Sequence, residues 1–230
     1  MKRKGMAALL LGIGALLGGC AWLVPPAPPP TPPATAPQNL AASFGTDRER
    51  ITLTWSPVEG ATYYEVQRGG AREGPWGTLG SANMPSLTDT VGEANEGRWF
   101  WYRVRACNAA GCGPWSEPVR GYAGRPPKPE GLWASQGDYD KQIVLTWNVM
   151  PGATYYQIFR EPGPQPGQSG LVFLAETTVN AYEDRAVRAG VRYRYAIRAC
   201  NGFGCSELSD PVEGCVEPCP LPFSADEGGS

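Results

Sequence analysis

The sequence contains no histidine and carries almost no net charge. Its 230 residues include 20 Lys and Arg against 22 Asp and Glu, which gives a net charge of −2. The absence of histidine removes the commonest general base, the commonest zinc ligand and every Ser-His-Asp or Cys-His arrangement. Without a basic excess, nothing attracts the phosphate backbone of nucleic acid. We therefore expect no metal, no nucleic-acid partner and no small-molecule substrate.

A run of apolar residues near the start indicates a targeting signal. Three of the first four residues are basic, and residues 6–17 are twelve uncharged, mostly apolar residues. This run is too short to cross a bilayer as a helix, which needs about 20 residues, and its basic flank is typical of a secretory signal. An uncleaved membrane anchor is the alternative interpretation.

The end of this run contains a processing motif. Leu17 to Cys20 reads LGGC, which resembles the lipobox of bacterial lipoproteins. The resemblance implies a signal peptide over residues 1–19 and a covalent diacylglycerol on Cys20, with no other cofactor. It also implies an exported protein that is lipid-anchored to the cell membrane or the outer membrane.

A proline-rich stretch follows the expected lipid site. Residues 24–37 (VPPAPPPTPPATAP) contain eight prolines in fourteen positions. Proline has no amide donor and a fixed φ, so this stretch does not form a helix or a central strand. We expect residues 20–37 to act as a spacer between the lipid and the first folded domain. The alternative is a PxxP ligand for an aromatic groove.

The rest of the chain is an internal repeat. Residues 51–68 (ITLTWSPVEGATYYEVQR) and 143–160 (IVLTWNVMPGATYYQIFR) match at ten of eighteen positions, and the stretch RACN occurs at both 105–108 and 198–201. A period of about 90 residues is the size of a small β-sandwich. The predicted organisation is a domain at 38–122, a linker at 123–128, a domain at 129–216 and a tail at 217–230.

Within each repeat the apolar residues alternate with polar ones. Phe100, Tyr102, Val104 and Ala106 alternate with polar or outward positions, as expected of a strand with one buried face. The segments LTW, GATYY and YRVRA, with LTW, GATYY and YAIRA in the second copy, resemble the fibronectin type III family. The resemblance implies an all-β fold of two tandem immunoglobulin-like, seven-stranded sandwiches. Tyr193 matches the corner tyrosine of the family, whereas Phe100 occupies that place in the first copy.

The cysteine spacing then predicts disulfide bonds. In the fibronectin type III arrangement each C-x4-C pair lies across the hairpin of the last two strands, on the outer face. An exported chain meets an oxidising compartment, and six cysteines remain when Cys20 is set aside. Zinc is the alternative, but the two C-x4-C pairs lie in separate domains, whereas structural zinc sites gather four ligands. The expected pairs are Cys107–Cys112, Cys200–Cys205 and Cys215–Cys219.

Candidate catalytic groups are few. The carboxylate pairs Asp138/Asp140 and Glu183/Asp184 are interpreted as solvated loop charges, because two small sandwiches with short loops offer no deep cleft. We therefore expect no catalytic residue and no enzyme activity.

One face of the first domain is a candidate binding surface. Aromatic and arginine side chains alternate there, and Pro114 to Glu117 (PWSE) resembles the start of the Trp-Ser motif of cytokine-receptor fibronectin domains. One interpretation is a self-satisfied cation–π ladder; the other is an aromatic platform for a glycan or a protein. The residues of this face are Tyr63, Trp101, Arg103, Arg105 and Trp115.

These observations predict a lipid-anchored scaffold or adhesion-type module of the cell envelope that binds or positions a protein partner. The alternative prediction is a lipoprotein that binds a glycan or cell-wall polysaccharide.

Overall fold

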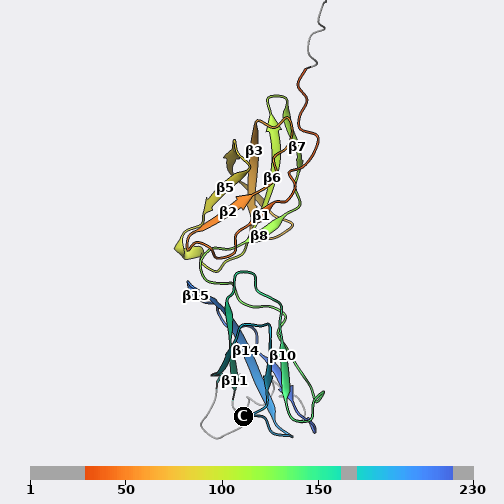
Figure 1. Cartoon of the computed structure of the whole chain (residues 1–230), viewed down its shortest axis with the longest axis vertical. Helices are drawn as coiled ribbons and strands as arrows, with labels where there is room; N and C mark the ends of the chain where they lie inside the picture. Colours follow the sequence, from red (N-terminus) through yellow and green to blue (C-terminus); the bar gives the residue numbers. More distant parts are fainter. Residues whose placement is uncertain (1–28, 162–169, 220–230) are drawn as a thin grey trace, which may run out of the picture. The chain divides into compact units, whose positions relative to one another are not determined.

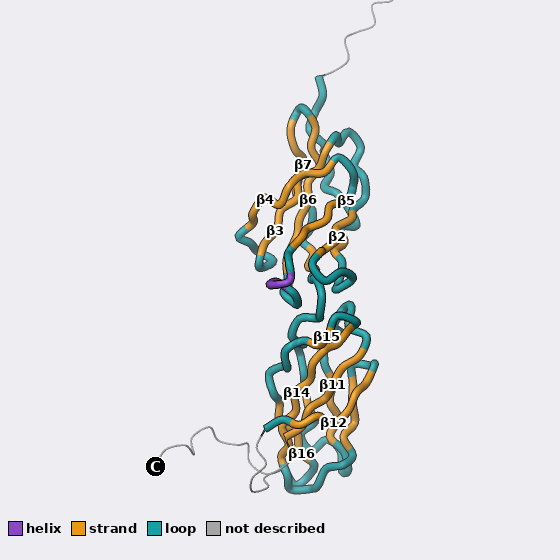
Figure 2. The backbone as a smooth tube through the Cα atoms, turned by 90° about the vertical axis from the view of Figure 1, so that its left-hand side faces the viewer, coloured by secondary structure: helices purple, strands orange, loops and turns teal. Residues whose placement is uncertain are grey.

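The computed structural model describes residues 29–161 and 170–219, which fold into two β-sandwiches (Figure 1). The predicted all-β fold is confirmed. Cys20 and the predicted signal peptide lie outside the described residues. Over the described ranges, no helix is long and apolar enough to cross a membrane. The short 3₁₀ segment η1, Glu93–Asn95, is coloured purple in Figure 2.

The first sandwich consists of two antiparallel sheets. The smaller sheet has the order β1-β2-β5, and the larger has the order β4-β3-β6-β7, with β8 also paired to β6. The elements are β1 Ala41–Ala42, β2 Arg50–Thr54, β3 Tyr63–Gly69, β4 Trp76–Ala82, β5 Ser86–Thr90, η1 Glu93–Asn95, β6 Phe100–Asn108, β7 Gly111–Trp115 and β8 Val119–Gly121.

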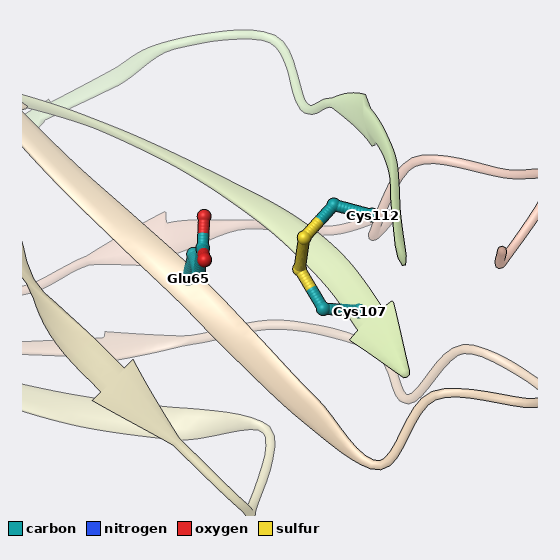
Figure 3. A group of neighbouring side chains, drawn as sticks. All are labelled: Glu65, Cys107 and Cys112. Atoms are coloured by element: carbon teal, nitrogen blue, oxygen red, sulfur yellow. A yellow bond between two sulfur atoms is a disulfide. The ribbon is translucent and has the colours of Figure 1, made fainter. Parts of the chain in front are cut away.

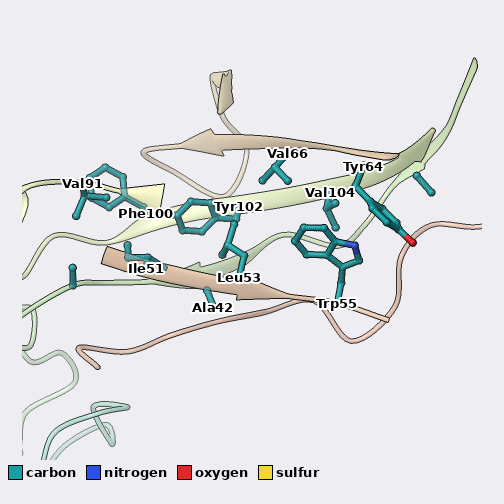
Figure 4. Close-up of a cluster of buried hydrophobic side chains, with 12 residues drawn as sticks. Ala42, Ile51, Leu53, Trp55, Tyr64, Val66, Val91, Phe100, Tyr102 and Val104 are labelled. Carbon is teal, nitrogen blue, oxygen red and sulfur yellow. The ribbon is translucent and has the colours of Figure 1, made fainter. Parts of the chain in front are cut away.

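The core of this sandwich follows from the alternation in the sequence. On β6 every second side chain from Phe100 to Ala106 is buried, and the residues between them face the outer surface of the sheet. Ile51 and Leu53 on β2 meet these side chains from the other sheet, as Figure 4 shows. Trp55 packs edge-on against Tyr64 with ring centroids 5.3 Å apart. The two sheets are therefore held together mainly by apolar burial.

The second sandwich repeats this plan. Its sheets have the orders β13-β10-β9 and β12-β11-β14-β15, with β16 also paired to β14. Trp147 packs on Tyr156 as Trp55 does on Tyr64, with centroids 5.2 Å apart. The elements are β9 Trp133–Ala134, β10 Ile143–Thr146, β11 Tyr155–Glu161, β12 Val172–Thr177, β13 Ala181–Asp184, β14 Arg192–Asn201, β15 Gly204–Cys205 and β16 Val212–Cys215.

The edge strand β12 of this sandwich is unusually apolar. It pairs with β11 on one side and lies at the end of its sheet. Val172 and Phe173 are 54% and 56% exposed, and the ring of Phe173 meets that of Phe159 edge-on at 5.9 Å.

The corner tyrosine behaves as its family resemblance implies. The backbone N–H of Arg188 donates to the hydroxyl of Tyr193, five residues further along the chain, at 3.1 Å. Phe100 has no hydroxyl, and the guanidinium groups of Arg68 and Arg98 lie over its ring instead, 4.9 and 5.4 Å from the centroid. Arg160 lies over the Tyr193 ring in the same way, 5.0 Å from its centroid, so the first sandwich keeps this cation–π contact and lacks the corner hydrogen bond.

A buried ionic group bridges the two sheets of each sandwich. In the second, the Asp184 carboxylate on β13 accepts hydrogen bonds from Arg160 on β11 at 2.7 Å and from the Tyr195 hydroxyl on β14 at 2.8 Å. Asp184 is 1% exposed, so its interpretation as a solvated charge is wrong: a partner on the opposite sheet neutralises it. Asp138, by contrast, is an exposed loop residue that accepts from the Gln136 backbone N–H.

The first sandwich contains the same group. Arg68 donates to both carboxylate oxygens of Asp89, at 3.1 and 2.9 Å, and the Tyr102 hydroxyl donates to the same carboxylate at 2.8 Å. Burial, followed by the negative charge of Asp89, raises the pKa of the Tyr102 phenol well above its ordinary value. Burial and Asp184 raise the pKa of Tyr195 in the same way. Both phenols are therefore neutral donors at physiological pH.

Candidate functional site

The outer face of the β4-β3-β6-β7 sheet carries a ladder of stacked tryptophan and arginine side chains. The Arg103 guanidinium on β6 lies 4.6 Å from the ring centroid of Trp76 on β4 and 4.6 Å from that of Trp115 on β7. Arg105, two residues further along β6, lies 4.5 Å from the Trp115 ring. The order Trp76–Arg103–Trp115–Arg105 defines what we call the ladder, and it places residues from three strands in contact.

Hydrogen bonds to β3 fix the two arginines of the ladder. Arg103 donates from Nε and Nη2 to Gln67 Oε1 at 2.9 and 2.6 Å. Arg105 donates from the same two atoms to Glu65 Oε2 at 2.9 and 2.7 Å. These contacts follow from the sheet register, because Gln67 is paired with Arg103 and Glu65 with Arg105 across β3 and β6. Their guanidinium groups are thus oriented before any ligand binds.

The charge balance differs along the ladder. Arg105 forms an ion pair with Glu65, whereas the side-chain partner of Arg103 is the neutral amide of Gln67. Partial desolvation and the neighbouring charge of Arg105 lower the pKa of Arg103 from its ordinary value, although arginine stays protonated at any physiological pH. The ladder therefore presents positive charge at Arg103.

Trp101 lies outside the ladder. It projects from the same face of β6, but its ring is contacted by Arg72, whose guanidinium lies 5.7 Å from the centroid. Arg72 in turn forms a 3.4 Å ion pair with the exposed Glu117. Both contacts are long and exposed, so Trp101 is held less firmly than Trp115.

Trp76 is not among the residues that the sequence predicts for this face. It stacks on Arg103, whereas the predicted residue Trp101 does not. A sequence signal for it exists. Trp76 and Trp115 both follow Gly-Pro, in the stretches Gly74-Pro75-Trp76 and Gly113-Pro114-Trp115. In the second sandwich Ala196 occupies the position of Arg103, and one arginine, Arg198, lies 5.2 Å over the ring of Phe159. The full ladder therefore belongs to the first sandwich.

The hairpin cysteines lie at the end of this face. Disulfide bonds join Cys107 to Cys112 and Cys200 to Cys205, each pair with Cα atoms 4.0 Å apart, and a third joins Cys215 to Cys219. Cys107, expected to face outward, is fully buried because it is flanked in the sheet by Tyr63 and Cys112. The Tyr63 hydroxyl lies 4.0 Å from Cys112 Sγ.

Glu65 lies next to the first disulfide, as Figure 3 shows. A carboxylate and two sulfurs within 4.8 Å of one another could form part of a metal site if the sulfurs were thiolates. Here the sulfurs are bonded to each other, and Arg105 engages the carboxylate. This arrangement is a structural clip beside the ladder.

Two family models match the chain. The fibronectin type III domain model matches residues 35–122, and the model described as fibronectin type III domain SaeA third domain matches residues 137–217. Between them they cover more than two thirds of the sequence. A comparison with curated proteins gives no match.

Solved structures similar to the chain include the FN1–FN3 domains of chicken CNTN1, with 18% identity, a TM-score of 0.38, and coverage of 80% of this chain and 67% of that one. A segment of two fibronectin type III domains from chicken tenascin has 17% identity and a TM-score of 0.35, and covers 78% of this chain and 98% of that one. A structure named FN3tt mut has 27% identity and a TM-score of 0.32, and covers 38% of this chain and 89% of that one.

The fold, the disulfides and the family models agree with one another. Domains of this type commonly serve as adhesion or protein-binding modules and are typically non-catalytic. Disulfides together with such domains indicate an extracellular or exported protein. The chain belongs to the fibronectin type III family, of which it carries two tandem domains.

Proposed function

We propose that the chain is a lipid-anchored scaffold of the cell envelope that binds or positions a protein partner through the outer face of its first domain. The basic start, the apolar run and the LGGC motif ending at Cys20 support the anchor. The membership of the fibronectin type III family supports a binding role without chemistry.

The ladder is the observation that carries this proposal. Two guanidinium groups, those of Arg103 and Arg105, lie within 4.6 Å of the Trp115 ring centroid, and Trp76 is contacted by Arg103. Sugar rings bind tryptophan by stacking on a bare ring face, whereas two arginines lie over the Trp115 ring and one over the Trp76 ring. Protein interfaces, in contrast, are enriched in tryptophan and arginine together. The geometry therefore favours a protein partner over a glycan.

The partner should contact the less firmly held end of this face. Arg72 contacts the Trp101 ring and the exposed Glu117, and neither Trp101 nor Arg72 belongs to the ladder, so a partner can engage them without disrupting it. We expect a partner surface that is acidic or carbonyl-rich opposite Arg103 and apolar opposite Trp101.

Crosslinking of the full-length protein in its own envelope fraction tests this surface. We expect a defined crosslinked partner with the wild type and with Trp133→Ala, which removes an exposed tryptophan of the second domain as a matched control. The double variant Trp101→Ala/Arg72→Ala should lose that partner. Equal capture by all three proteins would place the interface elsewhere.

The glycan alternative is tested by tryptophan fluorescence during titration with cell-wall polysaccharides. We expect no saturable change. A saturable shift that Trp101→Ala or Trp76→Ala removes would favour the glycan-binding function instead.

The lipid anchor is tested by metabolic labelling with palmitate. Wild type should incorporate the label and partition into detergent, because two or three acyl chains hold a protein on a bilayer far more firmly than one. Cys20→Ser lacks the acceptor thiol and should incorporate none. Equal labelling of the two proteins would refute the anchor while leaving the interface test unaffected.

A further inference from the structure

The last residues of the proline-rich stretch lie against the first sandwich. Thr31 begins the unit that contains both sandwiches, and Figure 1 shows the stretch before β1 running beside the β6–β7 hairpin. Pro33 and Pro37 are both buried. The side-chain amide of Asn108, at the tip of the hairpin, donates to the Thr31 carbonyl at 2.7 Å.

Two glycines of β7 provide the space for this stretch. A Cβ atom on Gly113 would lie 2.2 Å from the Pro33 carbonyl oxygen, well inside van der Waals contact. A Cβ on Gly111 would lie 3.3 Å from Pro32 Cγ, and Gly111 also has a φ of +137°, which disfavours other residues. The hairpin therefore has a backbone surface shaped for close approach by the proline stretch.

The asparagine contact recurs in the second domain, although Ser206 stands there at the position of Gly113. There the side-chain amide of Asn201 donates to the Gly124 carbonyl at 2.9 Å, and a Cβ on Gly204 would lie 4.0 Å from Arg125 Cβ. Asn108 and Asn201 are 93 positions apart, as are Thr31 and Gly124. Pro126, which is buried, stands 93 positions after Pro33. The hydrogen bond from the asparagine is therefore common to both domains, whereas the close approach at Gly113 belongs to the first.

Asparagine follows the first cysteine in both RACN stretches, and its Oδ1 accepts from the backbone N–H two residues further on, that of Ala110 or Phe203, at 2.9 Å. The disulfide fixes the hairpin tip, and the asparagine side chain then offers an N–H to a carbonyl of an extended segment. Proline-rich segments suit this role, because they have few amide donors to satisfy and are already extended before binding.

We propose that the β6–β7 hairpin is a binding site for an extended proline-rich segment, and that Thr31–Pro37 is its resident ligand. We call this segment the strap. It joins the proline-rich stretch to the disulfide hairpin, so that the strap shields β7.

Nuclear magnetic resonance relaxation of the ¹⁵N-labelled full-length chain tests the strap. In wild type the amides of Ala34, Thr35 and Ala36 should have order parameters near the rigid-backbone value of about 0.85. In Gly113→Val, whose side chain would displace Pro33, they should fall below about 0.6, the range of flexible segments. Gly77→Val is the matched control, because a Cβ there meets nothing closer than 3.8 Å.

A second variant keeps the test informative if Gly113→Val fails to fold. Replacing Pro32, Pro33 and Pro37 with serine should release the strap and leave the hairpin empty. A synthetic peptide of residues 31–37 added at millimolar concentration should then shift the Asn108 side-chain amide and Gly113 resonances. Wild type, whose site is filled, should show no such shifts.

Two results would overturn the proposal. One is high mobility of Ala34 to Ala36 in wild type, and the other is an absence of peptide-induced shifts in a triple-serine protein that is folded and has its disulfides formed. Peptide shifts of equal size in wild type and in the variant would also count against it, since they would show that the strap does not occupy the site.

Discussion

Replacing Asp184 with alanine should destabilise the second domain strongly, although Asp184 stands beside another acidic residue in a short polar stretch. The Asp184 side chain is 1% exposed and balances the charge of Arg160, whose side chain is 19% exposed. Alanine would leave a largely buried guanidinium without its counter-ion and a buried Tyr195 hydroxyl without its acceptor.

The expected magnitude follows from these two losses. Breaking a buried ion pair by removing one partner costs about 3–5 kcal/mol, and a buried donor without a partner costs about 1–3 kcal/mol. The losses share one carboxylate and do not add, and Arg160 can turn partly toward water. We therefore expect the free energy of unfolding of the second domain to fall by about 3–4 kcal/mol.

Glu183→Ala is the matched control. Glu183 is the neighbouring residue, its side chain is 50% exposed, and its partner Arg185 is 74% exposed, so its removal should cost less than about 1 kcal/mol. Asp89→Ala in the first domain should cost less than Asp184→Ala, because the Arg68 side chain is 38% exposed and is more easily solvated.

Hydrogen exchange read by mass spectrometry across a urea series measures these effects, because peptides from each domain report their own unfolding. Peptides from β11 and β14 should lose protection at a lower urea concentration in Asp184→Ala, and peptides from β3 and β6 should not. If Asp184→Ala and Glu183→Ala shifted the second domain equally, the buried ionic group would have no special role in its stability.

Three further predictions concern the disulfides, the tyrosines and the ladder. Peptide mapping of unreduced protein should find the three observed links, and Cys107→Ser/Cys112→Ser should lower the stability of the first domain by about 2 kcal/mol; a link between the domains would contradict this. The buried phenols of Tyr102 and Tyr195 stay protonated after the unfolded chain begins to ionise near pH 10, so stability should be full below pH 10. Above it, urea unfolding should show a fall of up to about 1.4 kcal/mol per pH unit per tyrosine, which Tyr102→Phe and Tyr195→Phe should flatten. Trp115→Ala should cost the first domain about 1 kcal/mol in urea unfolding by removing two cation–π contacts; unchanged stability with loss of the crosslinked partner would show that Trp115 serves binding instead.

The parts of the fold that sequence could predict are those fixed by short-range patterns. The alternation along β6 depends only on the strand period of two, so it identified Tyr102 and Val104 as core residues. The spacing of Cys107 and Cys112 depends on one hairpin, and the structure joins them. Each of these features depends on residues that are only a few positions apart in the sequence.

The features that sequence did not predict depend on contacts between distant strands. Trp76 reaches Arg103 through the pairing of β3 with β4, which includes a register shift between Val66 and Gln67. Asp184 is buried because Arg160 meets it from the opposite sheet. A polar residue beside a turn looks the same in the sequence whether it faces solvent or a cation on another strand, so local pattern could not distinguish the two.

The apolar edge of the second domain has a consequence for handling the protein in solution. An unpaired strand edge with exposed apolar side chains invites strands of other molecules to add to it. β12 contains a single charged residue, Glu176, and no proline, whereas the corresponding strand β4 has glycine or small polar residues at Gly77, Thr78, Gly80 and Ser81. Aggregation at high concentration would therefore start from the second domain, and Val172→Lys would be the substitution to raise solubility, because a lysine on an edge strand discourages further pairing.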